Sequence, residues 1–439
     1  MTLKNAITSR FGIQQAKSTL GGEAIAGVTT FVTMSYIVVV NPAILKAAGI
    51  PPEASMSATI AAAIFGTLIM GIYANRPFAI APYMGENAFL AYTVVQSLRY
   101  SWQAALAAVF IAGAAFLLLT VFRLRRWLVE AVPPALRHSF AVGIGLFLTF
   151  IGLNEAGIVM LGTTAAPLRA GHLTSLPVLI AIFGFLLMAV LTVRRFPAAI
   201  LIGILATASL CFVARVAPMP RAWVSWPPSL APIAFKLDFS HTLTWGFFPV
   251  VLTVFIMAFV DTMGTLIGVS ARAGFLDENG NLPQIERPML ADALSTMFAA
   301  LVGTSTSGAF IESATGVEAG GRTGLTAVVT ALCFAGTLFF APFIAAIPAQ
   351  AYAPALILVG LLMLAPVTRI RFDDVTELIP ACLVLVLMSF TYNVGIGITA
   401  GFVVYPICKL LAGRIQEIKP GLWVLAGLSL LFFIFYPYA

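Results

Sequence analysis

The stretch GTSTSGAFIESATGVEAGG at residues 303–321 places a carboxylate, Glu312, in a segment too rich in Gly, Ser and Thr for an ordinary membrane helix. The chain around it is 60% hydrophobic and 9% charged over 439 residues. A charged side chain at the centre of a bilayer costs about 2.5–3.5 kcal/mol on insertion scales. Interrupted helices are tolerated there only where protein or water surrounds them. Glu312 therefore marks a polar site inside a membrane protein.

Apolar windows of about 17–25 residues, long enough to cross a bilayer, fill nearly the whole chain. They predict an all-α polytopic membrane protein with fourteen spans, in two sets of seven separated by a polar connection at 217–242. The first set lies near 22–42, 56–75, 78–98, 102–122, 136–153, 173–193 and 197–216. The second set lies near 243–269, 290–303, 305–319, 323–346, 353–366, 375–391 and 394–412. The apolar stretch 421–437 is either a fifteenth span or a helix at the interface, and its composition fits both.

The Lys and Arg residues predict the orientation, because cytoplasmic loops collect them. With a cytoplasmic N-terminus, eighteen of the 24 lie on the inner side. The outer side has Lys46, Arg99, Arg169, Arg215, Arg221 and Lys236. The net charge of +7 therefore reports orientation and is no indication of nucleic-acid binding. The N-terminal segment 1–21 lacks the apolar core and cleavage site of a signal peptide.

The third span of each half has an unusual start. An odd number of spans per half inverts the second half relative to the first, a transporter plan with binding sites at interrupted helices. Pro77 and Pro82 predict extended backbone over 78–82 and a helix from about residue 83. Residues 304–308 play the same part before a helix that begins near Phe310. Because extended backbone in a bilayer needs hydrogen-bond partners, we expect the two short half-strands to pair.

The predicted binding site lies where these two helices begin, since free amides and a partial positive charge gather at helix N-termini. Glu86 and Asn87 fall in the first turn of one helix, and Glu312 in the first turn of the other. Asp261 lies midway along the span at 243–269, with further polar residues at helical spacing. The predicted site residues are Tyr83, Glu86, Asn87, Phe89, Asp261, Thr265, Phe310, Ile311 and Glu312.

Each polar residue also has a purely structural interpretation. Glu312 could accept hydrogen bonds from nearby amides, Asp261 could tie helices together, and Asn87 could cap its helix. Outside the site, we expect Glu23 to cap the first span and Glu155 to be solvated.

Nothing in the sequence indicates an enzyme, a metal or a cofactor. The four cysteines are scattered singly, no histidine relay crosses the membrane, and the chain has no nucleophile elbow, HExxH or nucleotide-binding loop.

At the predicted site residues and in the stretches around them, the chain resembles the nucleobase–cation symporter-2 family, specifically its azaguanine-like purine permease branch. The likeness lies in SYIVVVNPAIL at 35–45, MGxNAFxAYTVV at 84–95, VDTMGTLIG at 260–268 and LVGTSTSGAFIESATGVEAGGRTGLTAVV at 301–329. The resemblance implies a homodimer whose core domain moves against a gate domain. In this chain the core domain would comprise 22–122 and 243–346, and the gate domain 123–216 and 347–412, followed by the hydrophobic segment 413–439.

Residue by residue, the family's substrate-binding Asn falls on Asn87, its acidic residue of segment 8 on Asp261 and its Glu of segment 10 on Glu312. One departure is visible. Purine carriers commonly read Gly-Met-Gly-Leu-Asn where this chain has Tyr83-Met84-Gly85-Glu86-Asn87, which leaves the exact substrate open.

The sequence and the resemblance together imply proton-coupled uptake of purine nucleobases across the cytoplasmic membrane by alternating access. A carboxylate such as Glu312 can accept two parallel hydrogen bonds from a purine edge, and either Asp261 or Glu312 would carry the proton. Sodium is the alternative coupling ion. A second hypothesis keeps the fold but, because of Glu86, assigns an amino-rich or cationic heterocycle, a modified purine or a guanidine-like solute. A third is an anion transporter or channel, which three carboxylates without a nearby base argue against.

Overall fold

The computed structural model describes residues 3–122, 131–163, 166–220, 222–240, 244–277 and 282–436. Four of the basic residues used for the orientation, Arg123, Arg125, Arg126 and Arg221, lie outside these ranges. Within the ranges, nine helices are long and apolar enough to cross a membrane, and three more apolar helices are shorter. The chain is therefore a mostly helical, multi-pass membrane protein.

The helices of the first half are α1 (Leu3–Phe11), α2 (Leu20–Met34), α3 (Ile37–Ala47), α4 (Pro52–Ile72), α5 (Met84–Ala88), η1 (Phe89–Ser97), α6 (Trp102–Val121), α8 (Pro134–Glu155), α9 (Leu176–Val193) and α10 (Ala199–Val213). Those of the second half are α11 (Phe248–Ala273), α12 (Glu286–Val302), α13 (Ser313–Glu318), α14 (Gly324–Thr337), η2 (Leu338–Phe340), α15 (Ala341–Ala345), α16 (Ala349–Leu362), η3 (Ala365–Arg369), α17 (Val375–Phe390), α18 (Val394–Leu411), η4 (Ile415–Glu417) and α19 (Pro420–Phe435).

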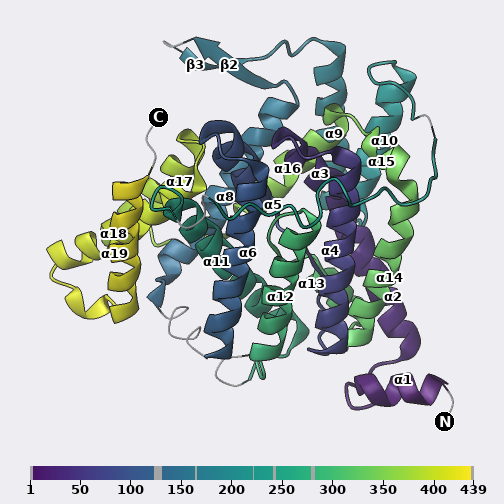
Figure 1. The fold of residues 1–439 in the computed structure, drawn as a ribbon, viewed down its shortest axis with the longest axis horizontal. Helices are drawn as coiled ribbons and strands as arrows, with labels where there is room; N and C mark the ends of the chain where they lie inside the picture. Colours follow the sequence, from purple (N-terminus) through teal and green to yellow (C-terminus); the bar gives the residue numbers. More distant parts are fainter. Residues whose placement is uncertain are drawn as a thin grey trace.

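The long helices pack in two groups (Figure 1). In the first group α2, α3, α4, α6, α11, α12 and α14 contact mainly one another, and in the second group α8, α9, α10, α16, α17 and α18 do so. The two groups meet where α5 contacts α8, where α3 contacts α16 and where α11 contacts α18. The C-terminal helix α19 packs on α18 and α11 at one side of the molecule.

A two-stranded antiparallel sheet lies inside the first group. Strand β1 (Ile80–Pro82) pairs with β4 (Ser307–Ala309), with Ala81 opposite Gly308. Both strands are fully buried, so their outer edges need partners as well. Thr67 on α4 bonds both the N–H and the C=O of Ile80, and Thr296 on α12 does the same for Ser307. The two halves of the chain thus satisfy their strand edges in the same way.

The two helices that follow this sheet differ in form. α5 begins at Met84 and continues as the nine-residue π-helix η1, a rare conformation that is frequent at functional sites. α13 begins only at Ser313, three residues later than the predicted start near Phe310, and ends after six residues. The predicted span 305–319 is therefore helical only over Ser313–Glu318, after a strand and a turn.

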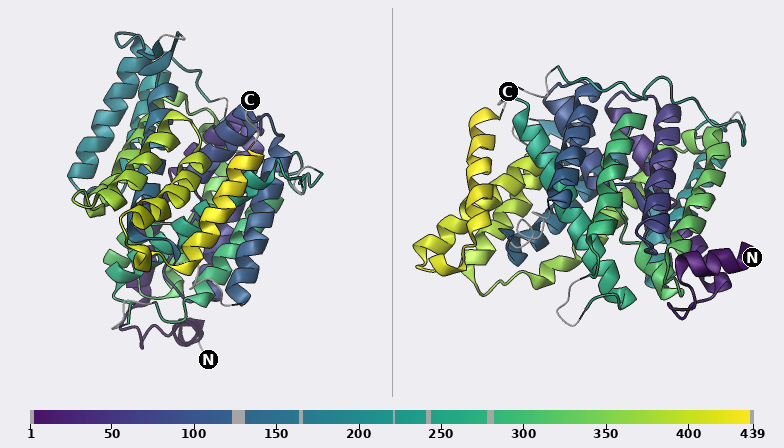
Figure 2. Two further views of the ribbon diagram at one scale, coloured as in Figure 1. Left: turned by 90° about the vertical axis from the view of Figure 1, so that its left-hand side faces the viewer. Right: turned by 60° about the horizontal axis from the view of Figure 1, so that its bottom comes forward.

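The span predicted at 22–42 is present as the apolar segment Leu20–Ala47, in which α2 and α3 are interrupted at Ser35 and Tyr36. One further prediction needs correction. An all-α protein was expected, but β2 (Val159–Thr163) and β3 (Ala166–Ala170) form a second antiparallel pair. This hairpin and α1 lie at opposite ends of the helical bundle, as Figures 1 and 2 show. Its strands are largely exposed and carry no buried alternation, so the hydrophobic pattern gave no signal for them.

Candidate functional site

Glu312 lies at the N-cap position of α13, where the chain leaves the central sheet. The hydroxyl of Tyr36, at the interruption between α2 and α3, donates to Oε1 of Glu312 at 2.6 Å. Tyr36 is buried and Glu312 is half-buried, whereas the neighbouring Ile311 is 61% exposed. No other described residue donates a hydrogen bond to the Glu312 carboxylate. Glu312 is thus held in place through one oxygen, while the other is available to a ligand.

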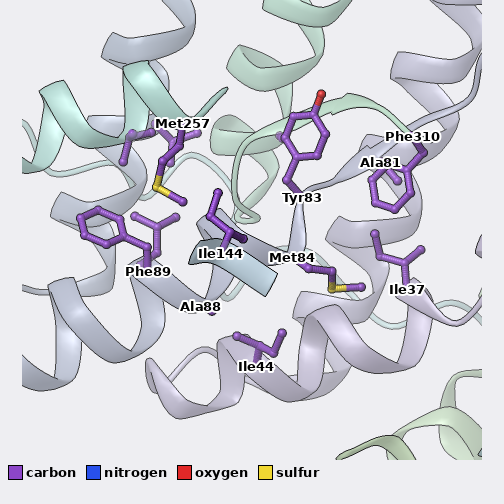
Figure 3. Packing of buried hydrophobic residues seen from close by; sticks show 14 of the residues in the cluster. Ile37, Ile44, Ala81, Tyr83, Met84, Ala88, Phe89, Ile144, Met257 and Phe310 are labelled. Carbon is purple, nitrogen blue, oxygen red and sulfur yellow. The ribbon is translucent and has the colours of Figure 1, made fainter. Parts of the chain in front are cut away.

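Tyr83 and Phe310 follow the two paired strands at equivalent positions. Their rings are nearly parallel, with centroids 6.0 Å apart and an angle of 9° between the planes. A Cβ atom on Gly308 would lie 2.2 Å from the Tyr83 hydroxyl oxygen, so the Tyr83 ring requires a glycine at that position. The sheet therefore presents two buried aromatic rings beside the helix starts (Figure 3).

Asp261 and Thr265 lie one turn apart on α11, and both side chains are half-buried. Between them, Thr262 is buried; its hydroxyl lies 3.3 Å from that of Tyr83 and also hydrogen-bonds Asp292. α11 thus adds its polar face to the site that the sheet begins.

Asp292 on α12 is a residue of the site that the sequence analysis missed. Its side chain is 1% exposed and accepts hydrogen bonds from Thr262 and, at 2.8 Å, from the backbone amide of Ala309. It joins α11 to the end of β4 and so supports the position of Phe310. The acidic residue within the apolar stretch LADALSTMF was the one sequence feature that could have indicated this role.

Glu86 in α5 is fully buried, and neither carboxylate oxygen accepts a hydrogen bond from another described residue. Asp261 and Asp292 act on it electrostatically. The structure therefore brings Glu86 and Asp261 into one acidic environment.

In Asn87, by contrast, both the nitrogen and the oxygen of the side-chain amide form hydrogen bonds. Its amide nitrogen donates to Asn41, and its amide oxygen accepts from Ser305. Asn41 in turn donates to Thr59 at 2.6 Å and to Thr304 at 3.0 Å. This buried chain of hydrogen bonds ties α3, α4 and α5 to the segment before β4.

Phe89 lies apart from the other aromatic residues of the predicted site. Figure 3 shows it beside Met257, on the opposite side of Ile144 from Tyr83 and Phe310. The structure therefore brings together Glu86, Asp261, Thr265 and Glu312 with the rings of Tyr83 and Phe310, and leaves Phe89, the first residue of η1, packed near Met257 of α11.

Two carboxylates outside the site differ from expectation. Glu23 does not cap its own helix, a role that Thr19 fills; it accepts from the amides of Arg322 and Thr323, at the start of α14. Glu155 is half-buried rather than solvated, and accepts from the hydroxyls of Tyr92 and Tyr352.

Among the described residues, no group of three or more His, Cys, Asp or Glu side chains is placed to hold a metal ion.

Comparison with known proteins identifies the family. A family model described as "Permease family" (Xan_ur_permease) matches residues 21–403. The chain belongs to this nucleobase–cation symporter-2 family. The family predicted from the motifs is thereby confirmed. Its members are permeases, so the chain is a transporter and not an enzyme.

Full-length relatives support this assignment. The chain is 42% identical to the putative permease MJ0326 of Methanocaldococcus jannaschii over 97% of each chain. It is 38% identical to the adenine permease AdeP of Escherichia coli, over 97% of this chain and 95% of that one. It is also 41% identical to the guanine/hypoxanthine permease PbuO of Bacillus subtilis, over 97% and 99%.

Solved structures show the fold. The transmembrane domain of the cyanobacterial bicarbonate transporter BicA aligns with a TM-score of 0.65 at 15% identity, covering 87% of this chain and 97% of that one. Murine Slc26a9, an anion transporter in the inward-facing state, aligns with a TM-score of 0.64 at 11% identity, covering 94% and 72%. The chain therefore shares the fold of these transporters.

Proposed function

We propose that this permease takes up purine nucleobases together with protons across the cytoplasmic membrane, by alternating access. The relatives named as adenine and guanine/hypoxanthine permeases match nearly the whole chain, and they support a purine substrate. The observation that carries the proposal is the Glu312 carboxylate, which Tyr36 orients beside the exposed Ile311.

This carboxylate suits a purine edge. Ring N–H and exocyclic amino groups are donors, and an ionised carboxylate accepts two such bonds in parallel. Thr265 adds a hydroxyl, and the parallel rings of Tyr83 and Phe310 offer apolar faces to a planar heterocycle. Asn87 holds the helix start through Asn41 and Ser305, so we assign it a positioning role.

Transport needs two bodies that move relative to one another. We propose that the first helix group, with the site, is the core domain and that the second group is the gate domain. Fourteen segments then result if β1, α5 and η1 form segment 3, and β4 and α13 form segment 10. The excess of Lys and Arg places α1 on the cytoplasmic side, and a homodimer follows from the family resemblance.

The coupling ion is proposed to be a proton, carried by a carboxylate of the site, with Asp261 and Glu312 as candidates. The membrane potential supplies about 2.3 kcal/mol per charge per 100 mV, enough for accumulation on the order of tens-fold. Sodium is the alternative, and replacing external sodium by choline would abolish uptake if sodium were the driver.

One observation favours a second substrate class. Glu86 adds a buried acid without a basic partner among the described residues, which suits an amino-rich or cationic heterocycle, such as a modified purine or a guanidine-like solute. An anion fits poorly, since Glu86, Asp261 and Glu312 would repel it, although BicA and Slc26a9 share the fold.

Uptake of radiolabelled hypoxanthine, guanine and adenine into proteoliposomes with an imposed pH gradient tests the proposal. We expect saturable, gradient-dependent uptake of at least one purine, and loss of uptake in Glu312→Gln. Glu318→Gln is a matched control, because Glu318 is exposed and paired with Arg272 at 3.2 Å. Normal transport by Glu312→Gln, or no purine uptake by the wild type, would overturn the proposal.

A further inference from the structure

Glu86 is the buried carboxylate whose role the contacts of the site leave unexplained. Its side chain has no exposed surface, and neither carboxylate oxygen has a hydrogen-bond partner among the described residues. It lies in α5, between the buried strand β1 and the π-helix η1. The backbone therefore fixes this carboxylate inside the protein and gives it no partner.

The charges that act on Glu86 are both acidic. They belong to Asp261 on α11 and to Asp292 on α12. In the ranges that the structure describes, no Lys or Arg forms an ion pair with Glu86 or Asp261. The other ionisable groups around α5 are the buried phenols Tyr83, directly before α5, and Tyr92 on η1. The packed helices add Lys46 on α3, Arg137, His138 and Glu155 on α8, and Arg272 on α11, all toward the helix ends.

The carboxylates of Glu312, Asp292 and Glu86 differ in the hydrogen bonds that they accept. Glu312 accepts from the Tyr36 hydroxyl, and Asp292 accepts from Thr262 and from the Ala309 amide. These two can stay ionised, because buried charge is tolerated where hydrogen bonds compensate it. Glu86 has no such compensation, and two like charges nearby add repulsion. Burial without a donor and repulsion by two nearby acids therefore favour the neutral, protonated form of Glu86 in this conformation.

On the basis of the proposed purine–proton symport, we propose that Glu86 and Asp261 form the proton-binding pair of the transporter, with Glu86 as its buried member, and that Glu312 is left to the substrate. Asp261 is half-buried, so it connects Glu86 to water. In the release step the O–H bond of the Glu86 carboxyl breaks, and the proton passes to the Asp261 carboxylate and then to water. Glu86 is left as a carboxylate, which the next proton neutralises.

The isosteric variant Glu86→Gln tests this assignment, because an amide resembles the protonated acid and cannot release a proton. In proteoliposomes, we expect counterflow of labelled purine between equal pH values to persist, at a rate changed by the substitution because Glu86 belongs to the site. Accumulation driven by a pH gradient should fall to a ratio near one, and the proton influx that accompanies purine uptake should disappear. Retained counterflow also shows that the variant is folded.

Two outcomes would overturn the proposal. Wild-type accumulation by Glu86→Gln would show that the proton is carried elsewhere, and loss of counterflow would make Glu86 a substrate contact or a structural residue. Glu312→Gln should lose counterflow as well as accumulation, and Glu318→Gln should lose neither. If the wild type transports no purine at all, the proposed function fails and these comparisons do not arise.

A measurement without substrate distinguishes failure of the Glu86 proposal from failure of the proposed purine transport. The infrared spectrum of the purified wild-type protein at neutral pH should contain a carboxylic-acid C=O band that is missing in Glu86→Gln. The same carboxylic-acid C=O absorption in both proteins would show that Glu86 is ionised and would overturn the proposal, whatever the substrate is.

Discussion

The hydroxyl of Tyr92 donates to Oε1 of Glu155 at 3.0 Å, and this bond joins the first helix group to the second. Tyr92 belongs to η1, and Glu155 ends α8 next to the β2–β3 hairpin. Tyr352 on α16 donates to the other oxygen at 3.3 Å, but that bond stays within the second group. The two tyrosines therefore form a matched pair, in which one bond crosses between the two helix groups and the other does not.

Tyr92→Phe should weaken the closure of the hairpin end. A hydrogen bond contributes about 1 kcal/mol net, which changes the ratio of two conformations about fivefold. A transporter that opens more often at the hairpin end is open less often at the α1 end. The measurement uses Ile311→Cys in a background without the four native cysteines. Labelling of this cysteine by an impermeant reagent added at the α1 face should slow by up to about fivefold in Tyr92→Phe. Tyr352→Phe should leave the rate unchanged. Equal effects of the two variants would contradict this role.

Tyr36→Phe should weaken substrate binding without removing the carboxylate. It deletes the 2.6 Å bond that orients Glu312, and hydrogen bonds to charged groups contribute about 1.5–3 kcal/mol. We therefore expect the KM for purine uptake to rise about tenfold or more, with little change in maximal rate. The control is Tyr73→Phe, since Tyr73 is 48% exposed at the end of α4. An unchanged KM would show that Tyr36 does not prepare Glu312 for the substrate.

The amino-acid sequence alone predicted those features of the site that cost free energy when they are placed in a membrane, namely buried charges and an interrupted helix. Glu312, Glu86 and Asp261 stand out as charges in an apolar chain, and the prolines around residues 78–82 interrupt a helix that hydropathy would otherwise continue. The predicted extended segments correspond to β1 and β4 in position, although the helix after β4 begins later than expected.

The partners of these residues could not be predicted, because they depend on tertiary contacts. Tyr36 lies 276 positions from Glu312, and nothing in either local stretch indicates the bond between them. Asp292 reads as one acid near the end of a span, and its function depends on Ala309 and Thr262 lying beside it. Glu23 was misassigned for the same reason, since its carboxylate accepts from the amides of Arg322 and Thr323, before α14, instead of capping its own helix.

Thr296→Val should destabilise the central sheet. The Thr296 hydroxyl bonds both the C=O and the N–H of Ser307, at 2.8 and 3.3 Å, and an isosteric valine leaves both buried groups without a partner. Each unsatisfied buried group costs about 1–3 kcal/mol. The melting temperature in detergent should fall, and Thr67→Val on the opposite edge should have a similar effect. Thr29→Val, which removes a hydroxyl bonded to its own helix, should change it little.

Asp374→Asn should make the thermal stability of the protein less dependent on pH. Asp374 lies before α17, where the Thr376 hydroxyl and the Arg414 guanidinium hold the pKa of its carboxyl below the usual range. A lowered folded-state pKa stabilises the protein above the unfolded pKa of about 3.9, and this contribution is lost as the pH falls through the folded value. Asp374 also partners Lys409, which is fully buried, at 3.5 Å. The variant should therefore melt below wild type at pH 7.

The difference in melting temperature between wild type and Asp374→Asn should shrink as the pH is lowered below about 4, because the carboxyl of the unfolded wild type then binds a proton while the folded carboxyl, with its lowered pKa, stays ionised. Thermal unfolding in mild detergent between pH 7 and pH 3 measures this convergence. Asp373→Asn is the neighbouring control, as Asp373 is exposed. A constant difference across that range would show that Asp374 stabilises the end of α17 through its hydrogen bonds and not through its charge.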